Sequence, residues 1–102
     1  HEKVGPEEIE QVIRMVEGVQ DAGVAPAPDP LLDNVPVALV VLASDEAPVL
    51  RRIRAECIRR LSAAKVPRRI VAVSSLPRSG YGKLDRRALR RLAADMAQRH
   101  RE

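Results

Sequence analysis

Lys83 stands in a segment whose residue types suit a ligand for phosphate. The segment from Leu76 to Arg86 reads Leu-Pro-Arg-Ser-Gly-Tyr-Gly-Lys-Leu-Asp-Arg. Gly80 and Gly82 can adopt backbone conformations closed to other residues, so the loop can project the lysine away from the domain. An ammonium group on a long stem is a good point-charge ligand for a phosphate.

The same segment lacks the features of a P-loop. That motif has Ser or Thr directly after its lysine, whereas Leu84 follows Lys83. No hydroxyl is therefore available at that position for magnesium. On loop composition alone, a surface loop with an incidental lysine is the better interpretation.

The charge of the chain is divided between its two halves. Residues 1–50 carry two basic residues, Lys3 and Arg14, against ten acids, and residues 51–102 carry sixteen basic residues against four acids. Such a division often marks a phosphate-rich partner. Arginines on the solvated faces of two helices would give the same pattern. From charge alone the two interpretations are equally good.

Cysteine, histidine and apolar content exclude several classes of site. Cys57 is the one cysteine, so an internal disulfide is impossible. His1 and His100 lie at opposite ends without ligand-spaced partners, so we expect no metal site. No apolar run approaches membrane-spanning length and no signal peptide is visible, so we expect a cytoplasmic protein without membrane contact. Because the chain begins at His1 rather than Met, we expect that its true N-terminus is missing.

The first half of the chain predicts a helix and two strands. Gly5-Pro6 opens the helix, Ile9 to Val16 gives it an apolar face, and Gly18 ends it. Val19 to Ala25 is predicted to be a short strand. It is followed by Pro26, Pro28 and Pro30, which end the strand and form a stiff loop. Val35 to Ala43 is the strongest strand signal, and Pro36 near its start indicates a strand end or an edge.

The second half predicts a helix, a third strand and a last helix. Ser44-Asp45-Glu46 opens the first of these helices, and Lys65-Val66-Pro67 ends it. Ile70 to Val73 forms the strand, and Ser74 to Gly82 forms a loop. Asp85 caps the last helix, whose inner stripe is Leu89, Leu92 and Met96.

This order of elements predicts an α+β fold. We expect a small two-layer domain, in which a three-stranded, mainly antiparallel sheet packs with about three helices. A chain of 102 residues without internal repeat or linker is one domain. Its core must be aliphatic, because Tyr81 is the only aromatic residue.

The segment around Lys83 resembles the last core motif of the adenylate-forming superfamily. That motif is Leu-Pro, a Thr or Ser two residues on, then Gly-Lys, with Arg three residues after the lysine. Here it matches Leu76-Pro77-Arg78-Ser79 and Gly82-Lys83-Leu84-Asp85-Arg86. The superfamily contains acyl- and aryl-CoA synthetases, peptide-synthetase adenylation domains and luciferases. Tyr81 departs from the pattern, since small or polar residues are common at its position.

Two further segments match the superfamily in the right order. Lys3-Val4-Gly5-Pro6-Glu7-Glu8-Ile9-Glu10 is similar to the stretch after its hinge, and Lys65-Val66-Pro67 is similar to the Lys-x-Pro before its last strand. The resemblance covers nearly the whole chain. It identifies residues 1–102 as the mobile C-terminal lid domain of such a ligase, whose large N-terminal domain is absent from the chain.

The resemblance implies an ATP-dependent acid–thiol ligase that works in two steps. A carboxylic acid attacks the α-phosphate of ATP, with Mg²⁺, to give an acyl-adenylate and pyrophosphate. A thiol of CoA, or the phosphopantetheine of a carrier protein, then displaces AMP after the small domain has rotated. The large domain would hold the ATP and acid pockets, so the isolated small domain would be inactive.

The resemblance also implies roles for individual residues. Lys83 would be the catalytic lysine of adenylate formation, carried by a loop that includes Pro77, Ser79, Gly80 and Gly82. Lys3 and Val4 would lie on the thiol side, where Arg68 and Arg69 could meet the phosphates of CoA or an acidic carrier protein. Lys83 is also similar to the lysine that is acetylated in some acyl-CoA synthetases.

Two other functions fit parts of the sequence. The first is a basic phosphate- or nucleic-acid-binding module without catalysis. Because Tyr81 is the only aromatic residue, the chain lacks a set of rings for base stacking, which weighs against nucleic acid. The second is a free-standing partner that supplies Lys83 to a separate large subunit. Neither the acid, the acceptor thiol nor the oligomeric state follows from the sequence.

Overall fold

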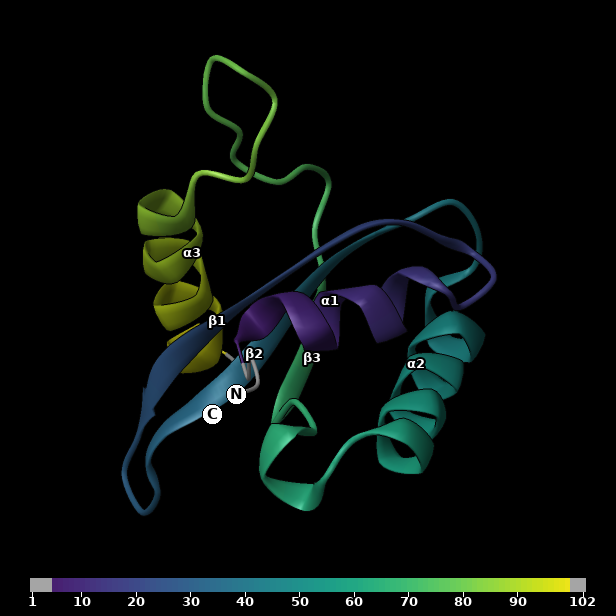
Figure 1. Cartoon of the computed structure of the whole chain (residues 1–102), viewed down its shortest axis with the longest axis horizontal. Coiled ribbons are helices and arrows are strands. Elements are labelled where there is room, and N and C mark those ends of the chain that lie inside the picture. Colours follow the sequence, from purple (N-terminus) through teal and green to yellow (C-terminus); the bar gives the residue numbers. More distant parts are fainter. Residues whose placement is uncertain (1–4, 100–102) are drawn as a thin grey trace.

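The computed structural model describes residues 5–99 of the chain (Figure 1). Its elements follow in the order α1 (Pro6–Arg14), β1 (Val19–Asp29), β2 (Asp33–Leu42), α2 (Glu46–Arg60), a 3₁₀ turn (Ala63–Lys65), β3 (Arg69–Ala72) and α3 (Arg86–Arg99). Helix, strand, strand, helix, strand and helix therefore occur in the predicted order, and the α+β class is confirmed.

The three strands form one mixed sheet in the order β1-β2-β3. β1 and β2 make a long antiparallel hairpin, in which Val19 lies opposite Leu42 and Asp29 lies opposite Asp33. β2 and β3 pair in parallel, with Val37 opposite Arg69. Most of the pairing is in the hairpin, so the sheet is mainly antiparallel, as predicted.

Helices cover both faces of this sheet, because side chains alternate along each strand. One core cluster joins α1 and α2 to the strand residues Ala22, Val24, Ala38 and Val40. The other joins α3 to the strand residues Ala25, Ala27, Val37, Leu39 and Val71. The domain therefore has three layers, and the predicted two-layer arrangement was wrong. The nearly unbroken apolar run of β2 fits a strand that is buried on both faces.

The prolines of β1 do not interrupt the strand, contrary to the prediction. β1 continues through Pro26 and Pro28 to Asp29, and Pro26 lies opposite Pro36 of β2. Because β1 is an edge strand, prolines two residues apart can both turn their nitrogens to the free edge, where a missing N–H costs no ladder hydrogen bond. Pro36 was predicted to mark a strand end or an edge, and this was wrong, since it lies within β2, the central strand, three residues after the strand begins.

Local signals set the helix ends. α1 begins at Pro6 after Gly5 and ends at Arg14, four residues before the predicted stop at Gly18. Gly18, with a φ of +99°, instead turns the chain into β1. Asp85 caps α3 as predicted, since the amide of Ala88 donates to its carboxylate over 3.1 Å. These residues determine where α1 and α3 begin and where the chain turns from α1 into β1.

α3 packs closely on the hairpin. Its fully buried stripe is Leu89, Ala93 and Ala97, whereas Leu92 and Met96 are only partly buried. A Cβ on Gly23 of β1 would lie 3.0 Å from Cδ1 of Leu89, so the glycine allows this approach. The close contact between Gly23 and Leu89 holds the first turns of α3 against the face of β1.

Candidate functional site

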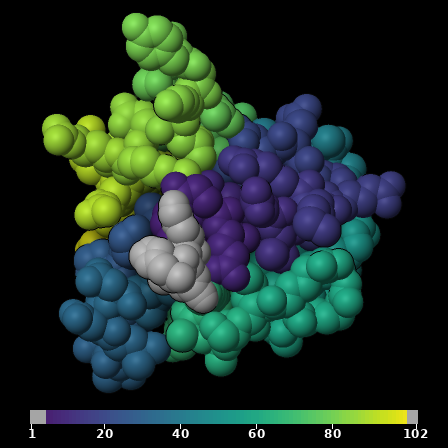
Figure 2. Space-filling model, viewed as in Figure 1, coloured from purple at the N-terminus to yellow at the C-terminus, as the bar shows by residue number. Residues whose placement is uncertain are grey.

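The segment that carries Lys83 is a small closed hairpin, which stands out from the body of the domain (Figure 2). Arg78 and Leu84 form an antiparallel bridge at its base. The amide of Ser79 donates to the carbonyl of Lys83 over 2.8 Å, and the amide of Gly82 donates to the carbonyl of Ser79 over 3.0 Å. We name residues 78–84 the lysine hairpin. Its backbone conformation is fixed by hydrogen bonds within the hairpin, so the projecting segment has a defined structure.

The two glycines of the lysine hairpin play different parts. Gly82 has a φ of +80°, a conformation that L side chains rarely adopt, and it lies directly before Lys83. Gly80 does not have a positive φ, and a Cβ there would meet no atom within 4 Å. The hairpin therefore requires glycine at position 82 only, whereas the sequence suggested that it requires both.

Lys83 is exposed, and within residues 5–99 it forms no ion pair. Tyr81, two residues earlier, is 95% exposed. The tip of the hairpin thus exposes an ammonium group that has no ion-pair partner within residues 5–99, together with one aromatic ring. Such a tip can bring a positive charge to an anionic group on another surface.

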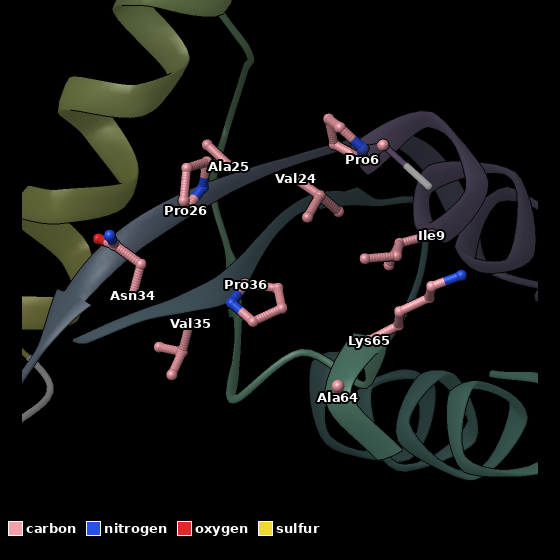
Figure 3. Close-up of a pocket in the computed structure, with 11 residues that line it drawn as sticks. Pro6, Ile9, Val24, Ala25, Pro26, Asn34, Val35, Pro36, Ala64 and Lys65 are labelled. Carbon is pink, nitrogen blue, oxygen red and sulfur yellow. The ribbon is translucent and has the colours of Figure 1, made fainter. Parts of the chain in front are cut away.

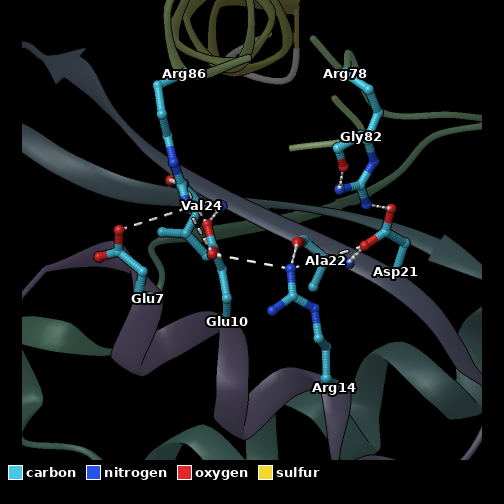
Figure 4. Close-up of polar contacts among 9 residues, drawn as sticks. All are labelled: Glu7, Glu10, Arg14, Asp21, Ala22, Val24, Arg78, Gly82 and Arg86. Atoms are coloured by element: carbon cyan, nitrogen blue, oxygen red, sulfur yellow. Dashed lines mark hydrogen bonds and ion pairs between the residues drawn. The ribbon is translucent and has the colours of Figure 1, made fainter. Parts of the chain in front are cut away.

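The hairpin is attached to the domain at its exit by Arg86 and Glu10 (Figure 4). Arg86 donates to both carboxylate oxygens of Glu10, over 2.6 and 3.0 Å. Glu10 is only 1% exposed, and it also accepts from the amide of Val24 over 2.8 Å. The hydrogen bond from Arg86 to Glu10 raises the pKa of this guanidinium above its ordinary value. The Arg of the motif therefore joins α3 to α1.

A second attachment lies at the entrance of the hairpin. Arg78 forms a short ion pair with Asp21 of β1, and it donates to the carbonyl of Gly82 over 3.0 Å. The amide of Asp85 donates to the carbonyl of Pro77 over 3.0 Å, which closes the stem below the hairpin. Both ends of the hairpin are thus tied to the domain.

Sequence analysis did not single out Glu10 as a buried, structural residue. Glu10 follows Ile9 and precedes Ile13 by three residues, and both isoleucines are buried. That position at the border of an apolar stripe was the available signal. Asp21 offered none, because its partner Arg78 lies 57 residues away in the chain.

The structure separates the predicted thiol-side residues from the lysine hairpin. Arg68 and Arg69 lie where β3 begins, and the hairpin follows only after the whole of β3 and a connecting segment. The amide of Arg68 donates to the carbonyl of Pro36 over 2.8 Å, so the backbone there continues the sheet. Lys3 and Val4 lie outside the described residues.

An apolar pocket of about 300 Å³ opens between α1, the hairpin of β1 and β2, and the 3₁₀ turn (Figure 3). Lys65 is the only ionisable residue of its lining, and its Nζ lies 2.9 Å from Oε1 of Glu8. The lining includes no residue of the lysine hairpin. The pocket can accept an apolar group but offers no free charge for phosphate or proton chemistry.

Within residues 5–99, no three His, Cys, Asp or Glu side chains gather into a group that could hold a metal ion. No helix in this range is long and apolar enough to cross a membrane.

Comparison with known proteins places the fold and the lysine hairpin in one family. The model of the family described as "AMP-binding enzyme C-terminal domain" matches residues 8–83, a range that ends on Lys83. The chain belongs to this family. The resemblance to the adenylate-forming superfamily, first seen in three motifs, is confirmed.

Relatives with this domain include ligases and a synthetase. The chain is 37% identical to the 2-succinylbenzoate–CoA ligase of Enterococcus faecalis over 81% of its own length and 17% of the relative's. It is 36% identical to triostin synthetase I of Streptomyces triostinicus over 94% of its own length and 18% of the relative's. The chain thus spans less than a fifth of the length of these relatives.

Solved structures agree with the sequence relatives. The anthranilate CoA ligase AuaEII, solved in complex with anthranoyl-AMP, superimposes with a TM-score of 0.83 at 31% identity, over 93% of this chain and 19% of that one. The amide bond synthetase McbA of Marinactinospora thermotolerans gives a TM-score of 0.79 at 32% identity, over 90% and 19% of the two chains. This AMP-binding enzyme C-terminal domain therefore has the fold found in full-length members of the family.

Proposed function

We propose that this domain supplies the catalytic lysine, Lys83, to an ATP-dependent ligase that joins a carboxylic acid to a thiol. The observation that carries the proposal is the uncommitted ammonium group of Lys83 on a projecting hairpin that is anchored at both ends. The family of the chain supports it, because the relatives named above include the 2-succinylbenzoate–CoA ligase of Enterococcus faecalis.

In the proposed first step, Lys83 lies between the carboxylate of the acid and the α-phosphate of ATP. Negative charge gathers there as the carboxylate oxygen attacks phosphorus and pyrophosphate leaves. A preplaced ammonium stabilises that charge in the transition state without forming a bond to the substrate. The acyl-adenylate is the product of this step.

ATP, Mg²⁺ and the acid would be held by a large N-terminal domain of the same enzyme. Within residues 5–99, no three His, Cys, Asp or Glu side chains gather where they could hold a magnesium ion, and the apolar pocket of Figure 3 includes no residue of the lysine hairpin. The second step, in which CoA or the phosphopantetheine of a carrier protein displaces AMP, requires the small domain to turn away from the adenylate. Lys3, Val4, Arg68 and Arg69 remain our candidates for the thiol side of the domain.

The test is Lys83→Ala in the full-length enzyme, with the two half-reactions measured separately. The rate of adenylate formation, measured through the release of pyrophosphate, should fall on the order of 10²–10³-fold. Losses of one charge contact to a transition state have effects of this size. Thioester formation from pre-made acyl-adenylate should change far less. An equal loss in both steps would point instead to a folding or docking role for Lys83.

A further inference from the structure

Five charged side chains of alternating sign connect the two ends of the lysine hairpin (Figure 4). Arg86 pairs with Glu10, Glu10 lies 3.9 Å from Arg14, Arg14 lies 3.8 Å from Asp21, and Asp21 pairs with Arg78. We name these five residues the charge ladder. It runs from the first residue of α3, across α1 and β1, to the first residue of the hairpin.

The charge ladder follows the free edge of β1. Arg14 donates to the carbonyl of Ala22 over 2.9 Å, and the carboxylate of Asp21 accepts from the amide of Ala22 over 2.9 Å. Farther along, Glu10 accepts from the amide of Val24. Backbone groups at a free sheet edge otherwise pair with water or with another chain. The ladder therefore uses a rigid strand as its support.

Burial divides the ladder into a fixed end and an adjustable end. The side chain of Glu10 is 1% exposed, so breaking its pair with Arg86, which is itself 41% exposed, would leave a buried charge without its main partner. The side chains of Asp21 and Arg78 are 24% and 38% exposed, so water competes for their pair. Breaking the Asp21–Arg78 pair at the entrance of the hairpin therefore costs less free energy than breaking the Glu10–Arg86 pair at its exit.

We propose that the Asp21–Arg78 pair is a positioning device for Lys83, an inference that rests on the proposed function. One guanidinium of Arg78 bridges Asp21 on β1 and the carbonyl of Gly82, which belongs to the peptide unit that leads into Lys83. Asp21 therefore sets the direction in which the hairpin presents the lysine. The backbone hydrogen bonds of the hairpin do not depend on Asp21, so its loss re-aims the hairpin without opening it.

The variant that isolates this role is Asp21→Asn, which keeps the shape of the side chain and an oxygen for the amide of Ala22 but removes the charge. In the full-length enzyme we expect kcat for adenylate formation to fall about tenfold, because small misplacements of a catalytic group are costly. KM for ATP and thioester formation from pre-made acyl-adenylate should not change. Arg78→Ala should lower kcat for adenylate formation by a similar factor. The double variant with Asp21→Asn and Arg78→Ala should be no slower than either single variant, and Arg78→Lys should recover part of the rate.

Glu56→Gln is the matched control, since Glu56 is the partner of exposed arginines on α2, away from the ladder. Lys83→Ala is measured in parallel. If Lys83→Ala is slow in adenylation while Asp21→Asn equals wild type, the positioning role is wrong and the proposed function stands. If Lys83→Ala retains full adenylation, the proposed function fails and the positioning role fails with it.

The positioning role can also be tested without an enzyme assay, by NMR spectroscopy of the 102-residue chain. In measurements of ¹⁵N–¹H residual dipolar couplings, which report the orientation of N–H bonds, Asp21→Asn should change the couplings of Gly82 and Lys83 and leave that of Leu39, in the central strand, unchanged. Unchanged values at Gly82 and Lys83 would overturn the positioning role whatever the enzyme assays give.

Discussion

Nη1 of Arg86 lies 2.6 Å from Oε2 of Glu10, although the two residues are 76 positions apart in the chain. The contact fixes the start of α3 against α1 and so decides where the lysine hairpin leaves the domain. Glu10 is the one charged side chain that is fully buried among residues 5–99. The family motif thus contains, three residues apart, an exposed Lys83 that forms no ion pair within residues 5–99 and an Arg86 that joins α3 to α1.

Arg86→Ala should destabilise the domain. It would leave the carboxylate of Glu10 buried with only Arg14, at 3.9 Å, as a counter-charge. Because Arg86 is itself partly exposed, we expect a loss of about 2–3 kcal/mol in the free energy of unfolding, below the cost of a fully buried pair. Urea unfolding of the chain measures it. Arg99→Ala, which removes an exposed partner of Asp95, is the control and should change little. Equal midpoints for both variants would contradict the structural role of Arg86.

Gly82→Ala and Gly80→Ala should differ. Alanine at 82 must adopt a φ of +80° or the hairpin must change shape, at a local cost of about 1 kcal/mol. Alanine at 80 meets open space and no positive φ. We therefore expect only Gly82→Ala to lose the NOE between Arg78 and Leu84 and to slow adenylate formation in the enzyme. Similar behaviour of the two variants would show that the turn is not held in this conformation.

Cys57 should report unfolding. It is fully buried, and burial raises the pKa of its thiol above the ordinary value of 9.0. The folded state thus prefers the protonated thiol, and this contribution to stability is complete below the ordinary pKa and is lost as pH rises above it. At pH 8 we expect the native chain to resist thiol alkylation and the urea-unfolded chain to react at once. Rapid native alkylation would contradict the burial of Cys57.

The chain alone should fold but should not form an adenylate. Two apolar clusters build its core, whereas the proposed ATP and acid sites lie in another domain. Pyrophosphate exchange into ATP by the chain should equal that of its Lys83→Ala variant, and both should show cooperative unfolding. Exchange above the variant's level would refute the assignment of the pockets to a large domain.

Acetylation of Lys83 should switch off adenylate formation without unfolding the domain. The lysine is exposed on a projecting hairpin, so a modifying enzyme can reach it, and acetylation removes the charge that Lys83 contributes to the proposed first step. Tyr81 at the same tip could hinder that enzyme, which Tyr81→Ser would relieve. The measurement is mass spectrometry of the full enzyme after incubation with acetyl-CoA and an acetyltransferase, alongside an adenylation assay. Full acetylation with unimpaired adenylation would refute both the switch and the catalytic role of Lys83.

The sequence by itself determined the order of the elements and the segment that carries Lys83. These features depend on neighbouring residues: the helix start at Gly5-Pro6, the apolar run of β2, and the cap of Asp85 on α3. Local backbone preferences and apolar periodicity act over a few residues, so they can be recognised without knowledge of the fold.

Tertiary structure alone decided three other features. Pro26 and Pro28 lie within a strand because β1 is at the sheet edge, a position that its own residues do not specify. The third layer arises because α3 packs on the face opposite α1 and α2. The charge ladder exists because folding brings residues 10, 14 and 21 beside residues 78 and 86. Such pairings are set by the packing of the whole chain, since a surface charge becomes a buried or bridging one only when distant elements meet.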